Sequence, residues 1–338
     1  MVGRPFARLL GLLLALLAAS SCGLAPAAVG AAEVAQAAAD DANGGYARAQ
    51  ELFHERKFAE AVLALDAFLN AHPSDVRALV LRGDCNADLG KNGAALADYD
   101  RALELNPKYE YGYVTRCETR LELDDFAGAL ADCDMAVQLD PSDPLAREDR
   151  GDVHFQREAY DLALDDYDQA IARGRSSAYV YAARCDTERI VAKYAAAQSD
   201  CEKALAIDPA SRRGRWARGR LAIVQKQYGA AIADLSAYIA LNPAKSDTAY
   251  YFRGLACNRA ERYQDALADL NLYVQRQPTD SDGYTERAIA HYGLGEKDAA
   301  LADLDAALHG YRKSGDAAQA ERVAAMIAAI GAGKAVTP

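Results

Sequence analysis

Residues 94–107 of the chain read AALADYDRALELNP, and this stretch decides the fold because it returns along the sequence. Residues 129–141 read ALADCDMAVQLDP, and the proline that closes each copy belongs to a regular series. The series runs at intervals of 34 or 35 residues, with one interval of 68: Pro73, Pro107, Pro141, Pro209, Pro243 and Pro278. A fixed period in this range indicates supersecondary units that stack on one another.

Short side chains recur with the same period at two positions, counted from the start of each unit. The eighth position holds Ala49, Gly83, Cys117, Gly151, Cys185, Gly219, Gly254 and Ala288. The twentieth position holds Ala61, Ala95, Ala129, Ala163, Ala197, Ala231, Ala266 and Ala300. Two helices approach closely only where side chains are short, and an Asn-Pro or Asp-Pro pair stops a helix. Each unit is therefore predicted to be a helical hairpin.

In these positions the chain resembles the tetratricopeptide repeat family. The resemblance implies an all-α fold, an α-solenoid in which about eight helical hairpins form a right-handed superhelix with a C-terminal capping helix. We expect the eight repeats at residues 42–312, the capping helix at 313–331 and a flexible tail at 332–338. Residues 1–31 are expected to form a signal peptide, and residues 32–41 a flexible tether.

The N-terminal segment has the composition of an export signal. Arg4 and Arg8 precede an apolar run at residues 9–17, and residues 1–31 contain no acidic side chain. This is the order of a signal peptide, and the run is short for a membrane span. Two processing sites compete, because residues 25–27 fit a small-x-small cleavage rule and residues 19–22 resemble a lipobox ending at Cys22. The protein is expected in the periplasm, either soluble or as a lipoprotein anchored through Cys22.

An arginine at the seventh position and an aspartate at the twenty-third recur in almost every unit. The arginines are Arg48, Arg82, Arg116, Arg150, Arg184, Arg218, Arg253 and Arg287. The aspartates are Asp98, Asp132, Asp166, Asp200, Asp234, Asp269 and Asp303, with Ala64 in the first unit. In a hairpin that folds near its sixteenth position these residues face one another. We predict a series of ion pairs along the stack; an anion-binding arginine track is the alternative.

Two pairs of cysteines occupy matching positions. Cys117 and Cys133 lie at the eighth and twenty-fourth positions of one unit, and Cys185 and Cys201 lie at the same positions of another. These positions also face each other, and exported proteins oxidise such pairs. We predict two disulfides; the alternative is that each cysteine is a small buried residue. Cys85 and Cys257 are too far apart in the array to pair and are expected to be buried thiols.

The candidate binding surface is the face of each first helix that carries positions two, five, nine and twelve. The resemblance implies that this face lines a concave groove where peptides bind. Position nine is acidic in four consecutive units and then basic: Asp84, Glu118, Asp152, Asp186 and Arg220. Aromatic and basic residues on the same face are Tyr111, Tyr179, Arg213, Trp216 and Tyr251. We predict a groove with an acidic half and an aromatic, basic half; the alternative is that these are solvated side chains.

The composition limits the function. The formal charge of −11 disfavours nucleic acid as a partner. The five histidines are scattered, and no phosphate-binding or dinucleotide-binding motif is present, so we expect no enzyme activity, no cofactor and no metal. The first hypothesis is an exported scaffold that binds a protein or a peptide with a basic segment, in envelope or secretion-complex assembly. The alternative is a periplasmic regulator or holding chaperone of envelope proteins, with membrane contact only through a lipid on Cys22.

Overall fold

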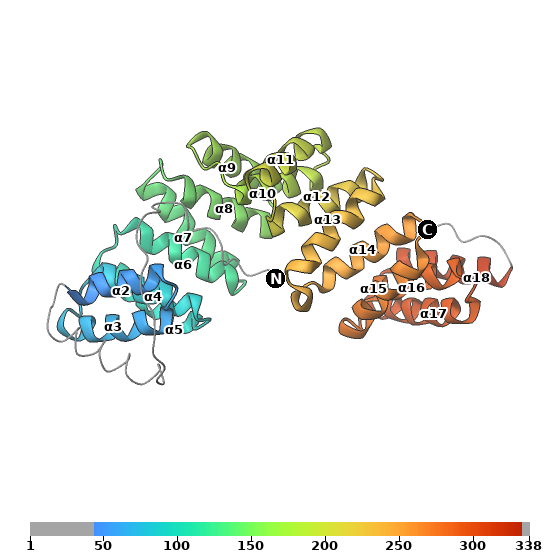
Figure 1. The fold of residues 1–338 in the computed structure, drawn as a ribbon, viewed down its shortest axis with the longest axis horizontal. Helices are drawn as coiled ribbons and strands as arrows, with labels where there is room; N and C mark the ends of the chain where they lie inside the picture. The colour runs from blue at the N-terminus through green and yellow to red at the C-terminus, as the bar shows by residue number, and fades with distance from the viewer. Residues whose placement is uncertain (1–43, 333–338) are drawn as a thin grey trace, which may run out of the picture. The chain divides into compact units, whose positions relative to one another are not determined.

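A computed structural model describes residues 44–332 of the chain. The expected signal peptide with Cys22, the tether at 32–41, and residues 333–338 of the expected tail lie outside the described residues. The described part is divided into two compact units, and the boundary in the sequence lies between Arg175 and Ser176. In Figure 1 the first unit carries α2 to α9 and the second carries α10 to α18.

The first unit consists of four helical hairpins. Their helices are α2 (Gly44–His54) with α3 (Phe58–Ala71), α4 (Val76–Asp88) with α5 (Asn92–Leu105), α6 (Glu110–Glu122) with α7 (Phe126–Leu139), and α8 (Pro144–Gln156) with α9 (Tyr160–Ala172). Each helix packs on its neighbours in the sequence, and the first helices of successive hairpins also touch.

The second unit repeats this plan and ends with an additional helix. Its hairpins are α10 (Ala178–Ile190) with α11 (Tyr194–Ile207), α12 (Arg212–Val224) with α13 (Tyr228–Leu241), α14 (Asp247–Arg259) with α15 (Tyr263–Arg276), and α16 (Ser281–Gly293) with α17 (Lys297–Ser314). A short 3-10 turn, η1 (Pro243–Lys245), precedes α14, and α18 (Ala317–Gly331) packs on α17. Residues 44–332 contain no strand, so the predicted all-α solenoid class is confirmed.

Side-chain caps explain where several first helices begin. The Asp75 carboxylate accepts hydrogen bonds from the backbone N–H groups of Arg77 and Ala78 at the start of α4. Asp143 caps α8 in the same way and is followed by Pro144 at the first helical position. Such caps satisfy N–H groups that have no partner within the helix, and proline is tolerated where that donor is not needed.

The turn inside each hairpin has one residue in the left-handed backbone region. Only two of these eight residues are glycines: Arg56, Gly90, Asp124, Glu158, Ala192, Lys226, Glu261 and Gly295, with φ between 57° and 82°. A side chain in this region costs about 1–2 kcal/mol. Since six positions tolerate that cost, the packing of the two helices, rather than the choice of turn residue, fixes the reversal.

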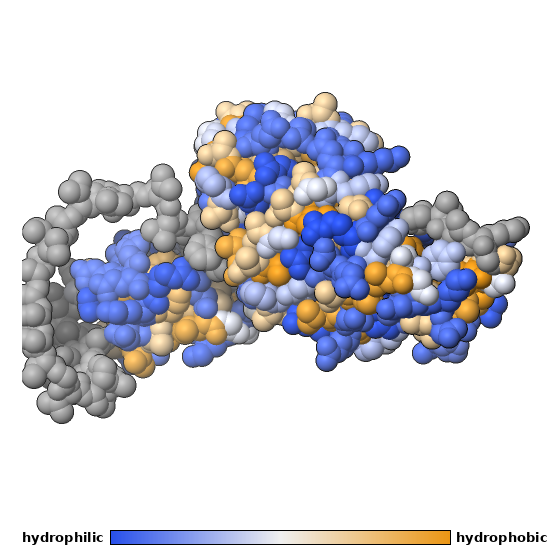
Figure 2. Space-filling view, turned by 45° about the vertical axis from the view of Figure 1, so that its right-hand side comes forward, coloured by the Kyte–Doolittle hydropathy of each residue, from blue (hydrophilic) through white to orange (hydrophobic). Residues whose placement is uncertain are grey.

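Short residues at the eighth position let the two helices of a hairpin meet. A Cβ atom added to Gly254 would lie 2.7 Å from Cγ of Leu270, and one added to Gly219 would lie 3.0 Å from Cγ of Leu235. The alanines at the twentieth position are fully buried. Figure 2 shows the outer surface of one face, where hydrophobic residues emerge in several patches between larger hydrophilic areas. The buried apolar side chains come from both helices of every hairpin.

Candidate functional site

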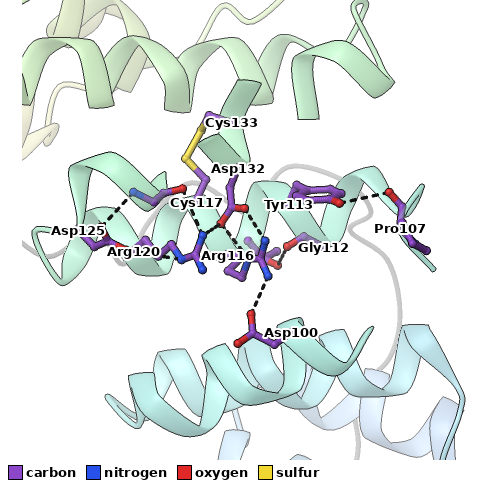
Figure 3. A network of polar contacts seen from close by, with 12 residues as sticks. Asp100, Pro107, Gly112, Tyr113, Arg116, Cys117, Arg120, Asp125, Asp132 and Cys133 are labelled. Atoms are coloured by element: carbon purple, nitrogen blue, oxygen red, sulfur yellow. Dashed lines mark hydrogen bonds and ion pairs between the residues drawn. A yellow bond between two sulfur atoms is a disulfide. The ribbon is translucent and has the colours of Figure 1, made fainter. Parts of the chain in front are cut away.

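Each arginine at the seventh position, after the first, binds the aspartate sixteen residues later. Arg116 donates from Nε to one carboxylate oxygen of Asp132 at 2.9 Å and from Nη2 to the other at 2.6 Å (Figure 3). The same two-bond contact joins Arg82 to Asp98, Arg150 to Asp166, Arg184 to Asp200, Arg218 to Asp234, Arg253 to Asp269, and Arg287 to Asp303. The predicted ion pairs are confirmed. Bidentate pairing leaves these arginines few donors for an external anion.

The third nitrogen of the arginine reaches the preceding hairpin. Nη1 of Arg116 lies 2.6 Å from Oδ1 of Asp100, on α5 (Figure 3). In the second unit, Nη1 of Arg253 donates to Ser236 Oγ at 2.9 Å. One guanidinium therefore ties both helices of its own hairpin to the hairpin before it. We call this series of contacts the arginine ladder.

The structure brings together both predicted cysteine pairs. Cys117 of α6 and Cys133 of α7 form a disulfide in the first unit, and Cys185 of α10 and Cys201 of α11 form one in the second. Each bridge lies where other hairpins pair a glycine with a large residue, as Gly83 does with Tyr99. Cys85 and Cys257 are buried free thiols.

The acidic residues predicted for the first unit do not form an open column of charge. Asp84 is 5% exposed and accepts hydrogen bonds from the hydroxyl groups of Tyr99 and Tyr111, at 3.0 and 3.1 Å. Asp152 is 3% exposed and accepts from Tyr167 at 2.7 Å. Glu118 is half-buried. Asp84 and Asp152 therefore lie beneath the surface and bind tyrosine hydroxyl groups. The sequence instead predicts acidic side chains that face the solvent in the groove.

Tyr111 and Asp84 both line a cavity of about 190 Å³ in the first unit. The cavity lies between α2, α4 and the start of α6, and it is lined by Tyr46, Gln50, Phe53, His54, Arg77, Val80, Leu81, Asp84, Tyr109 and Tyr111. Burial raises the pKa values of Tyr46 and Tyr109, so both phenols stay neutral at physiological pH. Tyr109 was not predicted, because it precedes α6 and falls outside the helical positions two, five, nine and twelve.

In the second unit the predicted aromatic and basic residues meet in contacts between α10, α12 and α14. The guanidinium of Arg213 lies 4.2 Å above the ring of Tyr179 and donates a hydrogen bond to its hydroxyl. Arg220 lies 5.3 Å from the ring centre of Trp216 and also binds Asp186, which is 7% exposed. Arg213 and Tyr179 thus form one pair, and Arg220, Trp216 and Asp186 form a cluster between α10 and α12.

Two residues that the sequence did not identify complete this cluster. Arg189, one turn beyond Asp186 on α10, binds the same carboxylate at 2.8 Å. Phe252 of α14 packs against both Trp216 and Tyr251, with ring centres 5.5 and 5.2 Å away. Burial, followed by the nearby Glu286 charge, raises the pKa of Tyr251. Position six, where Phe252 stands, was not among the face positions used for the prediction.

Within residues 44–332 no group of three or more His, Cys, Asp and Glu side chains is arranged to hold a metal ion. In the same range, no helix combines the length and the hydropathy that a membrane crossing requires.

Three segments of the sequence, residues 46–110, 118–178 and 217–281, match the tetratricopeptide repeat family. The chain belongs to this family. Tetratricopeptide repeat proteins bind protein partners, and the scaffold fold is typically non-catalytic. A search of curated proteins finds no match to the chain.

Solved structures show the same tetratricopeptide fold. The APC/C hetero-tetramer Cut9–Hcn1 matches with a TM-score of 0.64 at 15% identity, over 78% of this chain and 52% of that one. The chain thus spans about half of that protein's length. PilW, a type IV pilus biogenesis factor, gives a TM-score of 0.55 at 14% identity, over 62% of this chain and 97% of PilW. Pseudomonas aeruginosa pilF gives 0.53 at 16% identity, over 64% and 95%. At these identities the likeness concerns the fold.

Proposed function

We propose that this protein is an exported, non-catalytic scaffold that binds a protein or peptide partner on the first-helix face, meaning positions two, five, nine and twelve of each hairpin's first helix. The cavity between α2, α4 and α6 is the observation that carries the proposal, because it lies on this face and four large aromatic side chains, Tyr46, Phe53, Tyr109 and Tyr111, line it. Aromatic side chains supply much of the binding energy at protein interfaces. We infer eight repeats, expected at 42–312, followed by a capping helix; the helix expected at 313–331 is α18, which begins at Ala317 because α17 continues to Ser314.

The distribution of exposed apolar residues supports a defined partner over a holding chaperone. Among residues 44–332, the large hydrophobic residues with the most exposed side chains are spread along the sequence: Leu63, Leu89, Leu123, Leu162, Tyr194, Ile207, Val224 and Leu241. Scattered apolar residues are normal on a folded protein, whereas capture of unfolded chains needs a contiguous patch.

Export is the second part of the proposal. The signal-like composition of residues 1–31 supports it, and so do the two disulfides, because structural disulfides belong to oxidising compartments. PilW and pilF share only the fold with this chain. By analogy with PilW, a type IV pilus biogenesis factor, we propose a role for this chain in envelope or secretion-complex assembly.

Site-specific cross-linking tests the binding face. A photo-reactive amino acid replaces Gln50, which is exposed on the cavity rim, or Leu63, which is exposed on the second helix α3. Irradiation in the native envelope should give one stoichiometric adduct from Gln50 and none from Leu63. Equal adducts from both positions, or none from Gln50, would contradict the proposed face. A broad mixture of adducts from Gln50 would instead indicate the holding chaperone.

Cell fractionation tests export and the choice between the two processing sites. We expect the protein in the periplasmic or membrane fraction, with its N-terminal segment processed. If the protein is a lipoprotein, Cys22→Ser should release it from the membrane fraction. If it is a soluble periplasmic protein, the same replacement should not change its fraction. Retention of the wild-type chain in the cytoplasm would contradict export.

A further inference from the structure

We propose that the cavity of the first unit binds the ring of a phenylalanine or tyrosine side chain in the partner segment. The inference rests on the proposed function, because it specifies which side chain the first-helix face selects. Three observations support this occupant: the aromatic rings that line the cavity, the size of the cavity, and the engagement of the lining charges within the protein itself.

Rings from two separate helices line the cavity. Tyr46 and Phe53 belong to α2, Tyr111 belongs to α6, and Tyr109 directly precedes α6. All four side chains are partly exposed. Tyr109 and Tyr111 pack edge to face, with ring centres 6.4 Å apart and planes at 79°. A further ring can pack on these walls in the offset or edge-to-face geometry that aromatic pairs prefer.

The cavity has the size that one aromatic side chain requires. Its volume is about 190 Å³. An apolar cavity of about 150 Å³ is large enough to hold a benzene molecule. Gln50, His54 and Arg77 in the lining are exposed, so the cavity is open to the solvent on this side. A side chain of the partner can therefore enter without any helix being displaced.

The charged residues of the lining favour a neutral occupant. They are one acid, Asp84, and one arginine, Arg77. Asp84 is 5% exposed and accepts hydrogen bonds from the hydroxyl groups of Tyr99 and Tyr111. Arg77 forms an ion pair with Asp75 at 3.6 Å. A charged side chain would lose its water in the cavity and would find both opposite charges already engaged, which is costly. A neutral ring avoids this cost.

The aromatic residues predicted for the second unit are engaged with one another and with an arginine. Arg220 lies 5.3 Å from the ring centre of Trp216 and 5.1 Å from that of Phe252. Tyr251 packs against the rings of Phe252 and Tyr273, with both ring centres 5.2 Å away. The cavity of the first unit is therefore the better place on the first-helix face for an external ring.

An aromatic ring should also bind more tightly than an aliphatic side chain of the same size. Both side chains remove apolar surface from water when they enter the cavity. Only the aromatic ring adds the attraction between its positive edge and the negative face of another ring. The proposal therefore predicts a preference that depends on aromatic character and not on apolar area alone.

Titration of the purified protein with matched peptides, followed by nuclear magnetic resonance, tests the proposal. The peptides have blocked ends and the sequence Gly-Ser-X-Ser-Gly, where X is Phe, cyclohexylalanine, Arg or Glu. Cyclohexylalanine is close to Phe in size and is apolar, but its ring is saturated. The Phe peptide should shift the amide signals of α2 and of the start of α6. It should bind about two- to tenfold more tightly than the cyclohexylalanine peptide, and the Arg and Glu peptides should also bind more weakly than the Phe peptide.

Two results of this titration would overturn the proposal. One is equal or tighter binding of the cyclohexylalanine, Arg or Glu peptide. The other is the absence of the expected amide shifts with the Phe peptide.

Variants that separate the ring of Tyr109 from its hydroxyl group sharpen the test. Tyr109→Leu removes one ring from the wall and should reduce the preference for Phe over cyclohexylalanine, whereas Tyr109→Phe keeps the ring and should retain the preference. Tyr194→Leu is the matched control, because Tyr194 is 39% exposed on α11 in the second unit. Circular dichroism checks the folding of each variant, and Phe53→Leu replaces Tyr109→Leu if the latter does not fold. An unchanged preference in the folded leucine variant would overturn the proposal.

The salt dependence of binding tests the neutral character of the occupant. A ring without charge forms no ion pair in the cavity, so raising the salt concentration from about 0.05 M to about 0.5 M should change the affinity for the Phe peptide by no more than about twofold. A greater weakening by salt would show that charge dominates the interaction and would overturn the assignment.

The proposed function and the aromatic assignment fail separately. If Gln50 captures a partner but the peptides are not distinguished, the scaffold function stands and the aromatic assignment is wrong. If the peptides are distinguished but Gln50 captures nothing in the envelope, the cavity binds an aromatic ring without serving the proposed scaffold.

Discussion

A side chain on Gly151 would collide with the ring of Tyr167, because an added Cβ would lie 2.7 Å from Cε1 of that tyrosine. Both residues are buried, one on each helix of the α8–α9 hairpin. The glycine is thus required by the size of its partner. In the hairpins with disulfides, the same two positions are bridged by sulfur atoms instead.

Replacement of Gly151 by alanine should destabilise the first unit. The tyrosine ring must shift in a close-packed interior, and overpacking of this kind costs about 1–3 kcal/mol. Gly93→Ala is the matched control: Gly93 lies in α5, where an added Cβ would meet no atom within 4 Å. That change should be neutral or stabilise by up to about 0.5–1 kcal/mol. Urea unfolding followed by circular dichroism measures both, and equal midpoints for the two variants would contradict this account.

The arginine ladder should respond unevenly to the loss of single members. Asp269 is hydrogen-bonded by Arg253 alone among the described residues, so Arg253→Ala leaves a buried carboxylate without its partner at a cost of about 3 kcal/mol. Asp234 is bound by both Arg218 and Arg215, so Arg218→Ala should cost clearly less. Trp216 is the single tryptophan of the chain and lies in the same unit, so its fluorescence in urea reports both variants. A larger loss for Arg218→Ala would refute the pairing argument.

Removal of the Cys185–Cys201 disulfide should lower the stability of the second unit. The bridge closes a loop of sixteen residues, and the chain-entropy estimate for such a loop is about 3 kcal/mol. The double variant Cys185→Ala, Cys201→Ala should therefore unfold at lower urea, as reported by Trp216. Reducing agent should shift the wild type in the same direction and leave the double variant unchanged at this transition. A wild type insensitive to reduction would show that the bridge is absent in solution.

The two free thiols should be inert in the folded protein. Burial raises the pKa of Cys85 to about 12 and that of Cys257 to about 11, so the reactive thiolate is scarce at neutral pH. Iodoacetamide should label neither residue under native, non-reducing conditions and both after addition of denaturant, as peptide mapping by mass spectrometry can show. Rapid labelling of either residue at pH 8 without denaturant would contradict the burial.

Glu110 should make stability depend on pH near neutrality. Burial, followed by the nearby charges of Asp143 and Asp140, raises the pKa of Glu110 from its ordinary 4.5 to about 7. A raised carboxyl pKa contributes stability that is complete below the ordinary value and is lost as pH rises through about 7. Because the side chain is only half-buried, solvent screening reduces the effect to about 1 kcal/mol.

The test compares Glu110→Gln with the wild type by urea unfolding at several pH values. The variant should be more stable at pH 8, and this advantage should disappear near pH 5. Glu104→Gln, which changes an exposed acid on α5, is the control for replacing a glutamate by glutamine. A Glu110→Gln advantage that grows toward acid pH would show that the sign of the shift is wrong.

The repeated parts of the fold could be predicted from the sequence because each depends on spacing within one hairpin. Sixteen residues separate Arg116 from Asp132 and also Cys117 from Cys133, and the hairpin geometry alone places both pairs together. The same rule applies to every unit, so a local pattern was sufficient for the ladder and the helix pairs.

Features that depend on several hairpins could not be predicted in this way. The burial of Asp84 results from tyrosines on α5 and α6, and the cavity beside it also needs α2 and Tyr109 from the loop before α6. The left-handed turn residues could not be predicted either, because a residue such as Ala192, unlike glycine, gives no sequence signal for that backbone conformation. In each case the decisive neighbour lies on another element, or the packing overrides the local preference.

The start of the arginine ladder has a consequence for how the array comes apart. Ala64 replaces the aspartate in the first hairpin, and within the described part of the chain Arg48 forms an exposed ion pair with Glu51 of the same helix, α2. That hairpin should therefore fray before the others, which hydrogen exchange of its amides would reveal. Because α2 also provides Tyr46 and Phe53 to the cavity, a partner bound there would stabilise the first hairpin and slow the exchange of its amides. Partner binding and the local stability of the first hairpin are therefore coupled.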